Sequence, residues 1–239
     1  MLDSFGLEAI LHRKRLFLID TNVLFGSSSG DSRIEDDPLR LAASLAHDSW
    51  ELERMQTVYD IIRQNPNVRL TREIYMEILS KLGAIRTHCH VRKKARPIGL
   101  MDSYFRNHER ELVLGTDYWD QTKMRAPGYI LQERFSMRHP NLKCLSKADI
   151  SLLLKAVEVR LAGDPYMKLD IISADYGVKL GAELMFELFN RFPIGKAGQR
   201  RRLQQKRCMK VISRGYDEDY HDVFDSAAYY AGLVRQARH

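Results

Sequence analysis

Short runs of consecutive apolar residues alternate along the chain with longer segments of helical periodicity. The run from Leu16 to Ile19 has the length and continuity of a strand that is buried on both faces. Further strands are predicted at Val68 to Leu70, Leu169 to Ser173, and Met209 to Ser213. Strands separated by helical segments are typical of a parallel sheet with helices on its faces. We therefore predict an α/β fold, a three-layer parallel sheet flanked by helices.

Apolar residues spaced three and four positions apart predict the helices between these strands. Thr71 and Ser146 are expected to cap two of them, because each hydroxyl precedes the first periodic residues. The predicted helices cover the chain from about Pro38 to Asn65, from Thr71 to Gly83, from Ser146 to Gly163, from Tyr176 to about Phe189, and from about Asp219 onward.

The chain between the second and third predicted helices has weaker apolar patterning and a basic start. We predict a mostly helical insertion at about residues 84–143, and a basic connector at about residues 190–208. No internal repeat or low-complexity tract divides the sequence. Because domains average roughly 100 to 200 residues, we expect the 239 residues to form one domain.

Composition changes the expected partners more than the expected fold. The chain has 38 Lys and Arg residues against 31 Asp and Glu, and a formal net charge of +7, which favours polyanionic partners. Its three cysteines stand far apart, which argues against a disulfide framework and for a reducing cytoplasm. No apolar stretch reaches the roughly 18 residues that a membrane span needs, so no membrane partner is expected.

Four acidic residues stand where predicted strands end or predicted helices begin. Asp20 directly follows the first strand, and Asp175 lies just beyond a later one. Glu77 and Asp149 lie near the starts of helices that such a sheet would project toward the same edge. Ligands of parallel α/β sheets gather beyond the carboxyl ends of the strands, so the four carboxylates could converge there.

Each of these acids also has a purely structural explanation. Asp20 could form an Asx turn, and Asp175 could cap the helix that follows it. Glu77 precedes Lys81 by four residues, the favoured spacing for a surface ion pair. Asp149 has capping-box spacing from the preceding serine. Taken singly, none of the four indicates catalysis.

Carboxylates that share one pocket would repel one another unless divalent cations neutralised their charge. Oxygen ligands suit Mg²⁺ or Mn²⁺, and two such ions about 3.5 to 4 Å apart can support phosphodiester hydrolysis. The sequence has no GxxxxGK[ST] loop, GxGxxG turn or HExxH pair. This disfavours ATPases, dinucleotide enzymes and zinc proteases.

The acids occur in blocks that together resemble the PIN-domain nucleases. The blocks are Leu18 to Leu24, Thr71 to Glu77, Leu145 to Asp149, and Ile172 to Asp175. The resemblance implies an endoribonuclease that hydrolyses RNA with Mg²⁺ or Mn²⁺ held by four catalytic acids. It implies the following site residues: the metal-binding acids Asp20, Glu77, Asp149 and Asp175, and the supporting residues Thr21, Asn22 and Ser173. Glu73, one helical turn before Glu77, is the alternative to it.

Two basic segments are candidates for contacts with RNA, and the alternative for each is a solvated surface. Their residues are Arg92, Lys93, Lys94 and Arg96 in the first segment and Arg200, Arg201, Arg202, Lys206 and Arg207 in the second. Two alternatives stay open: a structure-selective DNA nuclease of the flap-endonuclease kind, and a non-catalytic RNA-binding protein with the same fold. A homodimer and an inhibitory protein partner are also considered.

Overall fold

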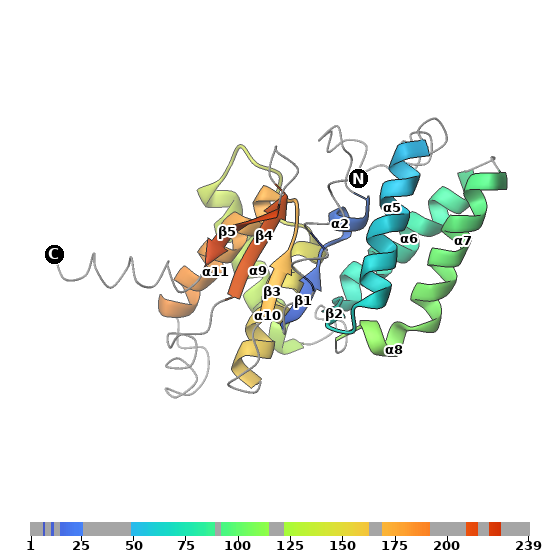
Figure 1. The fold of residues 1–239 in the computed structure, drawn as a ribbon. Helices are drawn as coiled ribbons and strands as arrows, with labels where there is room; N and C mark the ends of the chain where they lie inside the picture. Colours follow the sequence, from blue (N-terminus) through green and yellow to red (C-terminus); the bar gives the residue numbers. More distant parts are fainter. Residues whose placement is uncertain are drawn as a thin grey trace.

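The computed structural model describes residues 15–25, 49–88, 92–114, 122–162, 169–191, 209–214 and 220–225, together with Leu7 and Leu11. A five-stranded sheet with the strand order β2-β1-β3-β4-β5 runs through this part of the chain (Figure 1). Its strands are β1 (Leu16–Ile19), β2 (Val68–Arg69), β3 (Leu169–Ile172), β4 (Met209–Arg214) and β5 (Tyr220–Asp225). The first four pair in parallel and β5 pairs antiparallel with β4, so the predicted α/β class and parallel sheet are confirmed.

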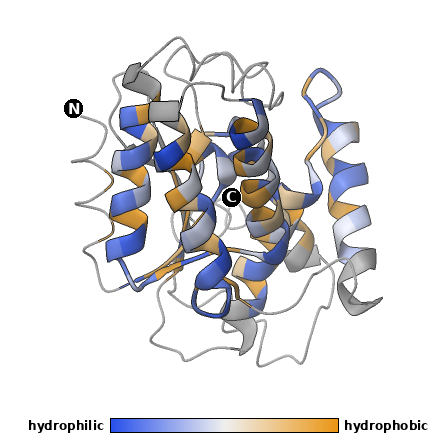
Figure 2. Ribbon diagram, turned by 90° about the vertical axis from the view of Figure 1, so that its right-hand side faces the viewer, coloured by the Kyte–Doolittle hydropathy of each residue, from blue (hydrophilic) through white to orange (hydrophobic). Residues whose placement is uncertain are grey.

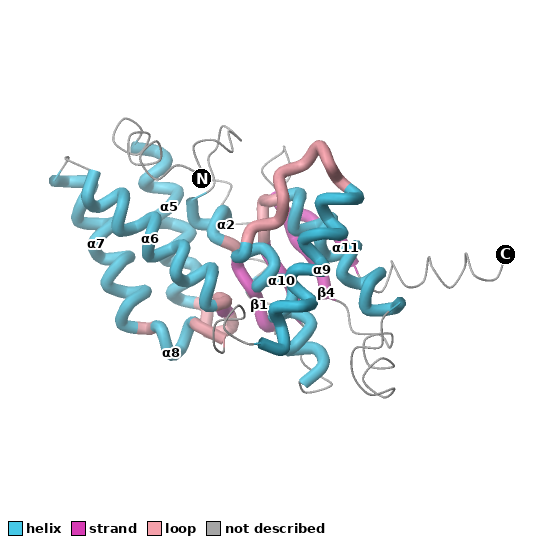
Figure 3. The backbone as a smooth tube through the Cα atoms, turned by 180° about the vertical axis from the view of Figure 1, so that it is seen from behind, coloured by secondary structure: helices cyan, strands magenta, loops and turns pink. Residues whose placement is uncertain are grey.

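The helices fall into two groups around this sheet. They are α2 (Thr21–Phe25), α5 (Ser49–Gln64), α6 (Arg72–His88), α7 (Arg92–Asn107), α8 (Glu109–Leu112), α9 (Thr122–Arg138), α10 (Lys147–Ala162) and α11 (Tyr176–Arg191). Helix α10 contacts β3, α11 contacts β4 and β5, and α9 contacts both helices; seen from behind, the three lie over the strands (Figure 3). Helices α5, α6 and α7 form a second group beside β2 (Figure 1).

The core lies between the sheet and these helices. The central strands are almost entirely apolar, and Phe17, Leu18, Ile171 and Ile172 are fully buried. Several helices carry hydrophilic residues along one side and hydrophobic residues along the other (Figure 2). No helix in the described part of the chain is both long enough and apolar enough to cross a membrane.

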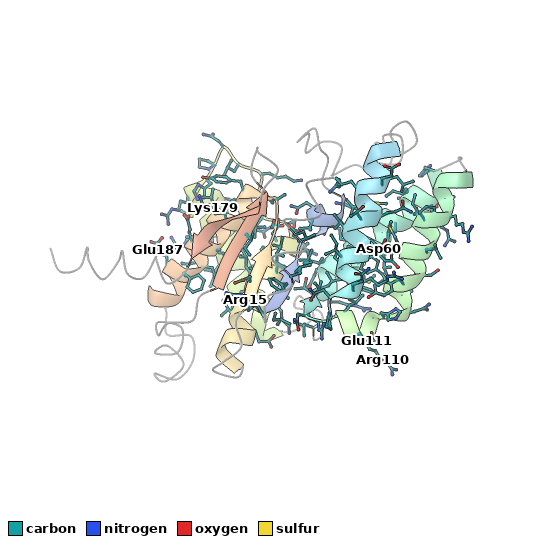
Figure 4. All side chains as sticks on the ribbon, in the orientation of Figure 1. Arg15, Asp60, Arg110, Glu111, Lys179 and Glu187 are labelled. Carbon is teal, nitrogen blue, oxygen red and sulfur yellow. The ribbon has the colours of Figure 1, made fainter. Side chains whose placement is uncertain are left out.

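A buried ion pair ties the two central strands together at the end opposite the acidic residues. Arg15, just before β1 (Figure 4), donates to the carboxylate of Asp170, which is fully buried within β3. A buried carboxylate needs such a partner, because an unpaired charge in the interior is costly. The pair therefore helps to fix the register in which Ile19 lies beside Ile172.

Within the described residues, the segment predicted as an insertion is mostly helical, and it returns to the sheet. It spans the end of α6, then α7, α8 and α9. After α8, the Leu70 amide donates to the Leu112 carbonyl at 2.8 Å, and the Leu114 amide donates to the Leu70 carbonyl at 2.9 Å. This parallel bridge between Leu70 and Val113 lies next to β2 and anchors the insertion to that edge.

One predicted helix boundary is wrong. Gly83 does not end α6, which continues to His88. A glycine inside a helix costs only about 1 kcal/mol, and the buried side chains of Leu82 and Ile85 offset that cost by packing into the core.

The helix predicted from about Asp219 is also wrong over the residues that the structure describes. Residues 220–225 form β5, in which Val223 and Phe224 have strand-favouring side chains. Acids such as Asp222 and Asp225 favour the first turn of a helix. Pairing with β4 outweighs that local preference. The rest of the predicted helix, residues 226–239, lies outside the described residues.

Candidate functional site

Asp20 and Ser173 lie side by side at the carboxyl edge of the sheet. Ile19 pairs with Ile172 in the parallel register of β1 and β3, so the next residue of each strand emerges at the same level. The Ser173 hydroxyl donates to Asp20 Oδ2 at 2.6 Å, and the Thr21 amide donates to Asp20 Oδ1 at 2.6 Å. Asp20 is only 5% exposed, so both of its oxygens are held in fixed directions.

Asn22 and Asp175 join the same hydrogen-bond network. Asn22 Nδ2 donates to Ser173 Oγ at 3.5 Å, while Asn22 Oδ1 accepts from the Ala174 amide at 3.0 Å. Ser173 Oγ also accepts from the Asp175 amide at 3.0 Å. One serine hydroxyl therefore positions the acid of β1 and the loop that carries the acid after β3.

Asp149 stands at the start of α10 in the predicted capping box. Its Oδ2 accepts a hydrogen bond from the Ser146 amide at 2.7 Å, and its own amide donates to Ser146 Oγ at 3.1 Å. Asp149 is 9% exposed. The capping role is confirmed, and it fixes one oxygen of a carboxylate that is almost wholly buried.

Asp175 caps α11 and is exposed to solvent. Its Oδ1 accepts from the Gly177 amide at 2.6 Å. A Cβ atom at position 177 would lie 3.0 Å from that oxygen, closer than carbon and oxygen atoms normally approach. Glycine at 177 therefore permits this orientation of the Asp175 carboxylate.

Glu77 is paired with Lys81, as its spacing predicts, but the lysine is not on the surface. Glu77 Oε1 lies 2.9 Å from Lys81 Nζ, and Lys81 is only 8% exposed. The ammonium also lies 5.7 Å from the centre of the Phe25 ring, at the end of α2. The predicted surface ion pair is thus partly buried, between α6 and the short helix that follows Asp20.

The electrostatics of Asp20 and Asp149 show that the four acids lie close enough to act on one another. Burial raises the pKa of Asp20 well above its usual 3.8, and Asp149, Asp175 and Glu77 raise it further, against the hydrogen bond from Ser173. Burial, Asp175 and Glu77 likewise raise the pKa of Asp149 to about 6, against the bonds from Ser146. The acids come from four separate segments, and the fold brings the charges of the other three within range of Asp20.

The same interactions favour Glu77 over its alternative. Glu77 is among the charges that raise the pKa of Asp20 and of Asp149. Glu73 lies one turn earlier on α6. The effect of Glu77 on both aspartates supports the choice of Glu77.

The donors at this edge suit a hard cation in kind, although they are not arranged around one. No three Asp, Glu, His or Cys side chains of the described residues form a group that could hold an ion as they stand. The acids instead accept the hydrogen bonds described above. Thr21 Oγ1, next to Asp20, is buried and has no hydrogen-bond partner among the described residues. A buried hydroxyl without a partner costs about 1–3 kcal/mol, so an oxygen-rich, unsatisfied site remains beside Asp20.

Lys81 is the residue of this site that the sequence did not assign to it. The sequence does indicate that Lys81 is buried, because Lys81 continues the buried stripe of Ile74, Ile78 and Ile85 at the spacing of a helix face. A lysine in such a stripe must carry its charge toward the core or bend around it. The i,i+4 pair with Glu77 concealed this, since that spacing alone is typical of exposed helix surfaces.

The predicted basic contacts lie only partly within the described structure. Arg96 is exposed on α7, whereas Arg92, Lys93 and Lys94 belong to α7 with side chains outside the described set. The second segment is outside the described residues altogether, namely Arg200, Arg201, Arg202, Lys206 and Arg207.

Comparison of the chain with protein-family models, with curated proteins and with solved structures finds no match. The candidate site is therefore defined by the geometry and electrostatics of this chain alone.

Proposed function

We propose that this protein is a metal-dependent endoribonuclease that hydrolyses RNA phosphodiester bonds at the acidic edge of the sheet. One observation carries the proposal. Asp20 and Asp149 are carboxylates whose pKa values are raised first by burial and then by other acids: by Asp149, Asp175 and Glu77 for Asp20, and by Asp175 and Glu77 for Asp149. Such mutual repulsion destabilises a folded protein unless protons or cations neutralise it. Clusters of this kind are therefore candidates for functional sites.

Asp20, Asp149 and Asp175 would hold Mg²⁺ or Mn²⁺, with Glu77 at the rim of the same site. These ions take oxygen ligands, and within the described residues Asp149 Oδ1 and Asp175 Oδ2 accept no hydrogen bond. A bound ion of this type polarises a phosphate and lowers the pKa of a water that attacks phosphorus. The protein would supply the rest of the geometry through the hydrogen bonds that Ser173, Ser146 and Gly177 donate to the acids.

The choice of RNA rests on different grounds from the choice of chemistry. The net charge of +7 favours a polyanion of either kind. The resemblance of the four acid-bearing blocks to the PIN-domain nucleases favours RNA. In this proposal the basic residues of α7, including exposed Arg96, and those of residues 200–207 contact the phosphate backbone.

The proposal is tested by incubating labelled RNA and DNA with the protein in Mn²⁺ or in EDTA. We expect RNA cleavage in Mn²⁺, none in EDTA, and none with an Asp20→Asn variant, which keeps the shape of the side chain. Asp60→Asn is the matched control. Asp60 is a half-exposed acid on α5 (Figure 4) that pairs with Arg63.

Three other results would each point elsewhere. Cleavage of DNA alone would indicate a DNA nuclease, and RNA binding without cleavage would indicate a non-catalytic RNA-binding protein. Cleavage that survives in Asp20→Asn would place the reaction at another site.

A further inference from the structure

A buried lysine lies beside the acidic edge. Lys81 is 8% exposed, although lysine is almost never fully buried unless it is paired. It continues the stripe of Ile74, Ile78 and Ile85 on α6, whose burial carries the side chain of Lys81 inward. The stem can pack against this apolar surface, but the ammonium must find a partner.

Among the described residues, the ammonium has two partners, the carboxylate of Glu77 and the ring of Phe25. Lys81 Nζ lies 2.9 Å from Glu77 Oε1 and 5.7 Å from the centre of the Phe25 ring. Phe25 is the last residue of α2, which begins directly after Asp20 and contacts α6. The carboxylate and the face of the aromatic ring together offset the cost of removing the ammonium from water.

Glu77 is therefore held differently from the three aspartates. Asp20, Asp149 and Asp175 each accept a hydrogen bond from a backbone amide, which leaves their negative charge uncompensated. Glu77 faces a full positive charge. Among the acids that raise the pKa of Asp20 and of Asp149, Glu77 has the smallest effect, which is consistent with a place at the rim of the cluster.

We propose that Lys81 is an internal counter-ion of the acidic edge, which holds Glu77 in an ion pair so that a divalent cation is bound by Asp20, Asp149 and Asp175 without it. Lys81 is in this sense a positioning residue. The inference rests on the metal site of the proposed function, but it does not depend on RNA being the substrate.

The chain contains a closely matched control for the removal of this lysine. Lys155 on α10 is also 8% exposed, and its Nζ lies 2.6 Å from Glu158 Oε2. The side-chain exposures of the two pairs are nearly equal, at 10% and 36% for Lys81 and Glu77 and 10% and 38% for Lys155 and Glu158. The second pair includes none of the four acids, so it separates the loss of a buried lysine from the loss of this one.

The test measures Mn²⁺ binding by calorimetry on protein stripped with EDTA. The wild type is compared with Lys81→Met, Glu77→Gln, the double variant and Lys155→Met. We expect Lys81→Met to bind Mn²⁺ at least about tenfold more tightly, because one freed negative charge acts on the cation at an effective dielectric constant of about 20. Glu77→Gln should weaken Mn²⁺ binding to a similar degree, because it frees the positive charge of Lys81 instead, though less than Asp149→Asn does. The double variant and Lys155→Met should keep the wild-type affinity.

Each other outcome is decisive. Unchanged or weaker Mn²⁺ binding by Lys81→Met would overturn the inference. So would a loss in Glu77→Gln as large as the loss in Asp149→Asn, because Glu77 would then be a ligand itself. The Glu77→Gln measurement decides the matter even if Lys81→Met does not fold. A wild type that binds no Mn²⁺ overturns the inference together with the metal site. One that binds Mn²⁺ in the expected pattern but cleaves no RNA overturns the proposed function alone.

Discussion

The hydroxyl of Ser173 donates a 2.6 Å hydrogen bond to Asp20 Oδ2, across 153 positions of sequence. The contact exists because β1 and β3 are neighbours in parallel register, which brings the residues after their last paired positions to one level. Ser173 also accepts from the Asp175 amide. A single side chain thus links two of the acids on which the proposed site depends.

Replacing Ser173 with alanine should damage the site more than the fold. Without its donor, the pKa of Asp20 should rise further, since this hydrogen bond opposes the effect of burial. We expect Mn²⁺ affinity or cleavage to fall by roughly 10- to 100-fold, as for other residues that orient metal ligands. Stability should fall by only about 1–3 kcal/mol. Ser173→Thr keeps the hydroxyl and should retain most activity in a parallel titration; equal losses in both variants would count against the hydrogen bond.

Stability without metal should depend on pH through Asp149. Its folded pKa of about 6 lies above the usual 3.8, so the folded state binds this proton more tightly than the unfolded state does. The proton on Asp149 therefore stabilises the folded state fully below about pH 4, and this stabilisation is lost as pH rises through about 6. Urea unfolding in EDTA should therefore show Asp149→Asn more stable than the wild type at pH 7, by roughly 2–3 kcal/mol, and nearly equal to it at pH 4. A constant difference across this range would contradict the raised pKa.

Divalent cations should reverse that dependence. Mn²⁺ competes with the proton for the same carboxylates, so its stabilising effect should be larger at pH 7 than at pH 5. Thermal unfolding with and without Mn²⁺ at the two pH values measures this. The difference should disappear in Asp149→Asn. Equal stabilisation of wild type and variant would place the ion elsewhere.

Gly177→Ala should reduce activity with little loss of stability. The added Cβ would meet Asp175 Oδ1 at 3.0 Å and push the carboxylate out of its present orientation. Gly83→Ala is the control, because the same addition within α6 meets no atom within 4 Å and should stabilise the protein by about 0.5–1 kcal/mol. Cleavage rates and unfolding curves of the two variants separate the effects. Full activity in Gly177→Ala would show that this orientation of Asp175 is not needed.

Replacing Arg200, Arg201 and Arg202 with alanine should weaken RNA binding and reduce its salt dependence. Loss of three phosphate contacts lowers the slope of log K against log salt by about 2 for single strands. Fluorescence anisotropy across a salt series measures the slope. The control removes three arginines that already pair with acids, Arg63, Arg106 and Arg138. An unchanged slope in the first variant would exclude these residues from the interface.

The sequence predicts the parts of this fold in which local pattern and tertiary packing agree. The apolar run ending at Ile19 and the capping box at Ser146 both indicate their structures directly. Local preference failed where packing opposed it. Gly83 lies within a helix whose apolar face continues past it, and the acids near Asp222 lie in a strand that pairs with β4.

Some features of the candidate site are likewise predictable from the sequence, and others are not. Asp20, Asp149 and Asp175 are visible in the sequence because they stand at the ends of strands or the start of a helix. Their mutual effect on pKa depends on burial and on distances between segments, which no local pattern contains. For Lys81 the local pattern is misleading. Its spacing from Glu77 is typical of an exposed pair, but the stripe of isoleucines on the same helix face carries Lys81 inward.

The central claim is that Asp20, Asp149 and Asp175 form one centre for a divalent cation. Crystals of the protein soaked in Mn²⁺ test it most directly, through an anomalous difference map recorded near the manganese absorption edge. The account predicts a peak within direct coordination distance of oxygens from all three aspartates, with Glu77 still paired to Lys81. A map with no peak at this edge, or with manganese bound elsewhere on the molecule, would contradict it.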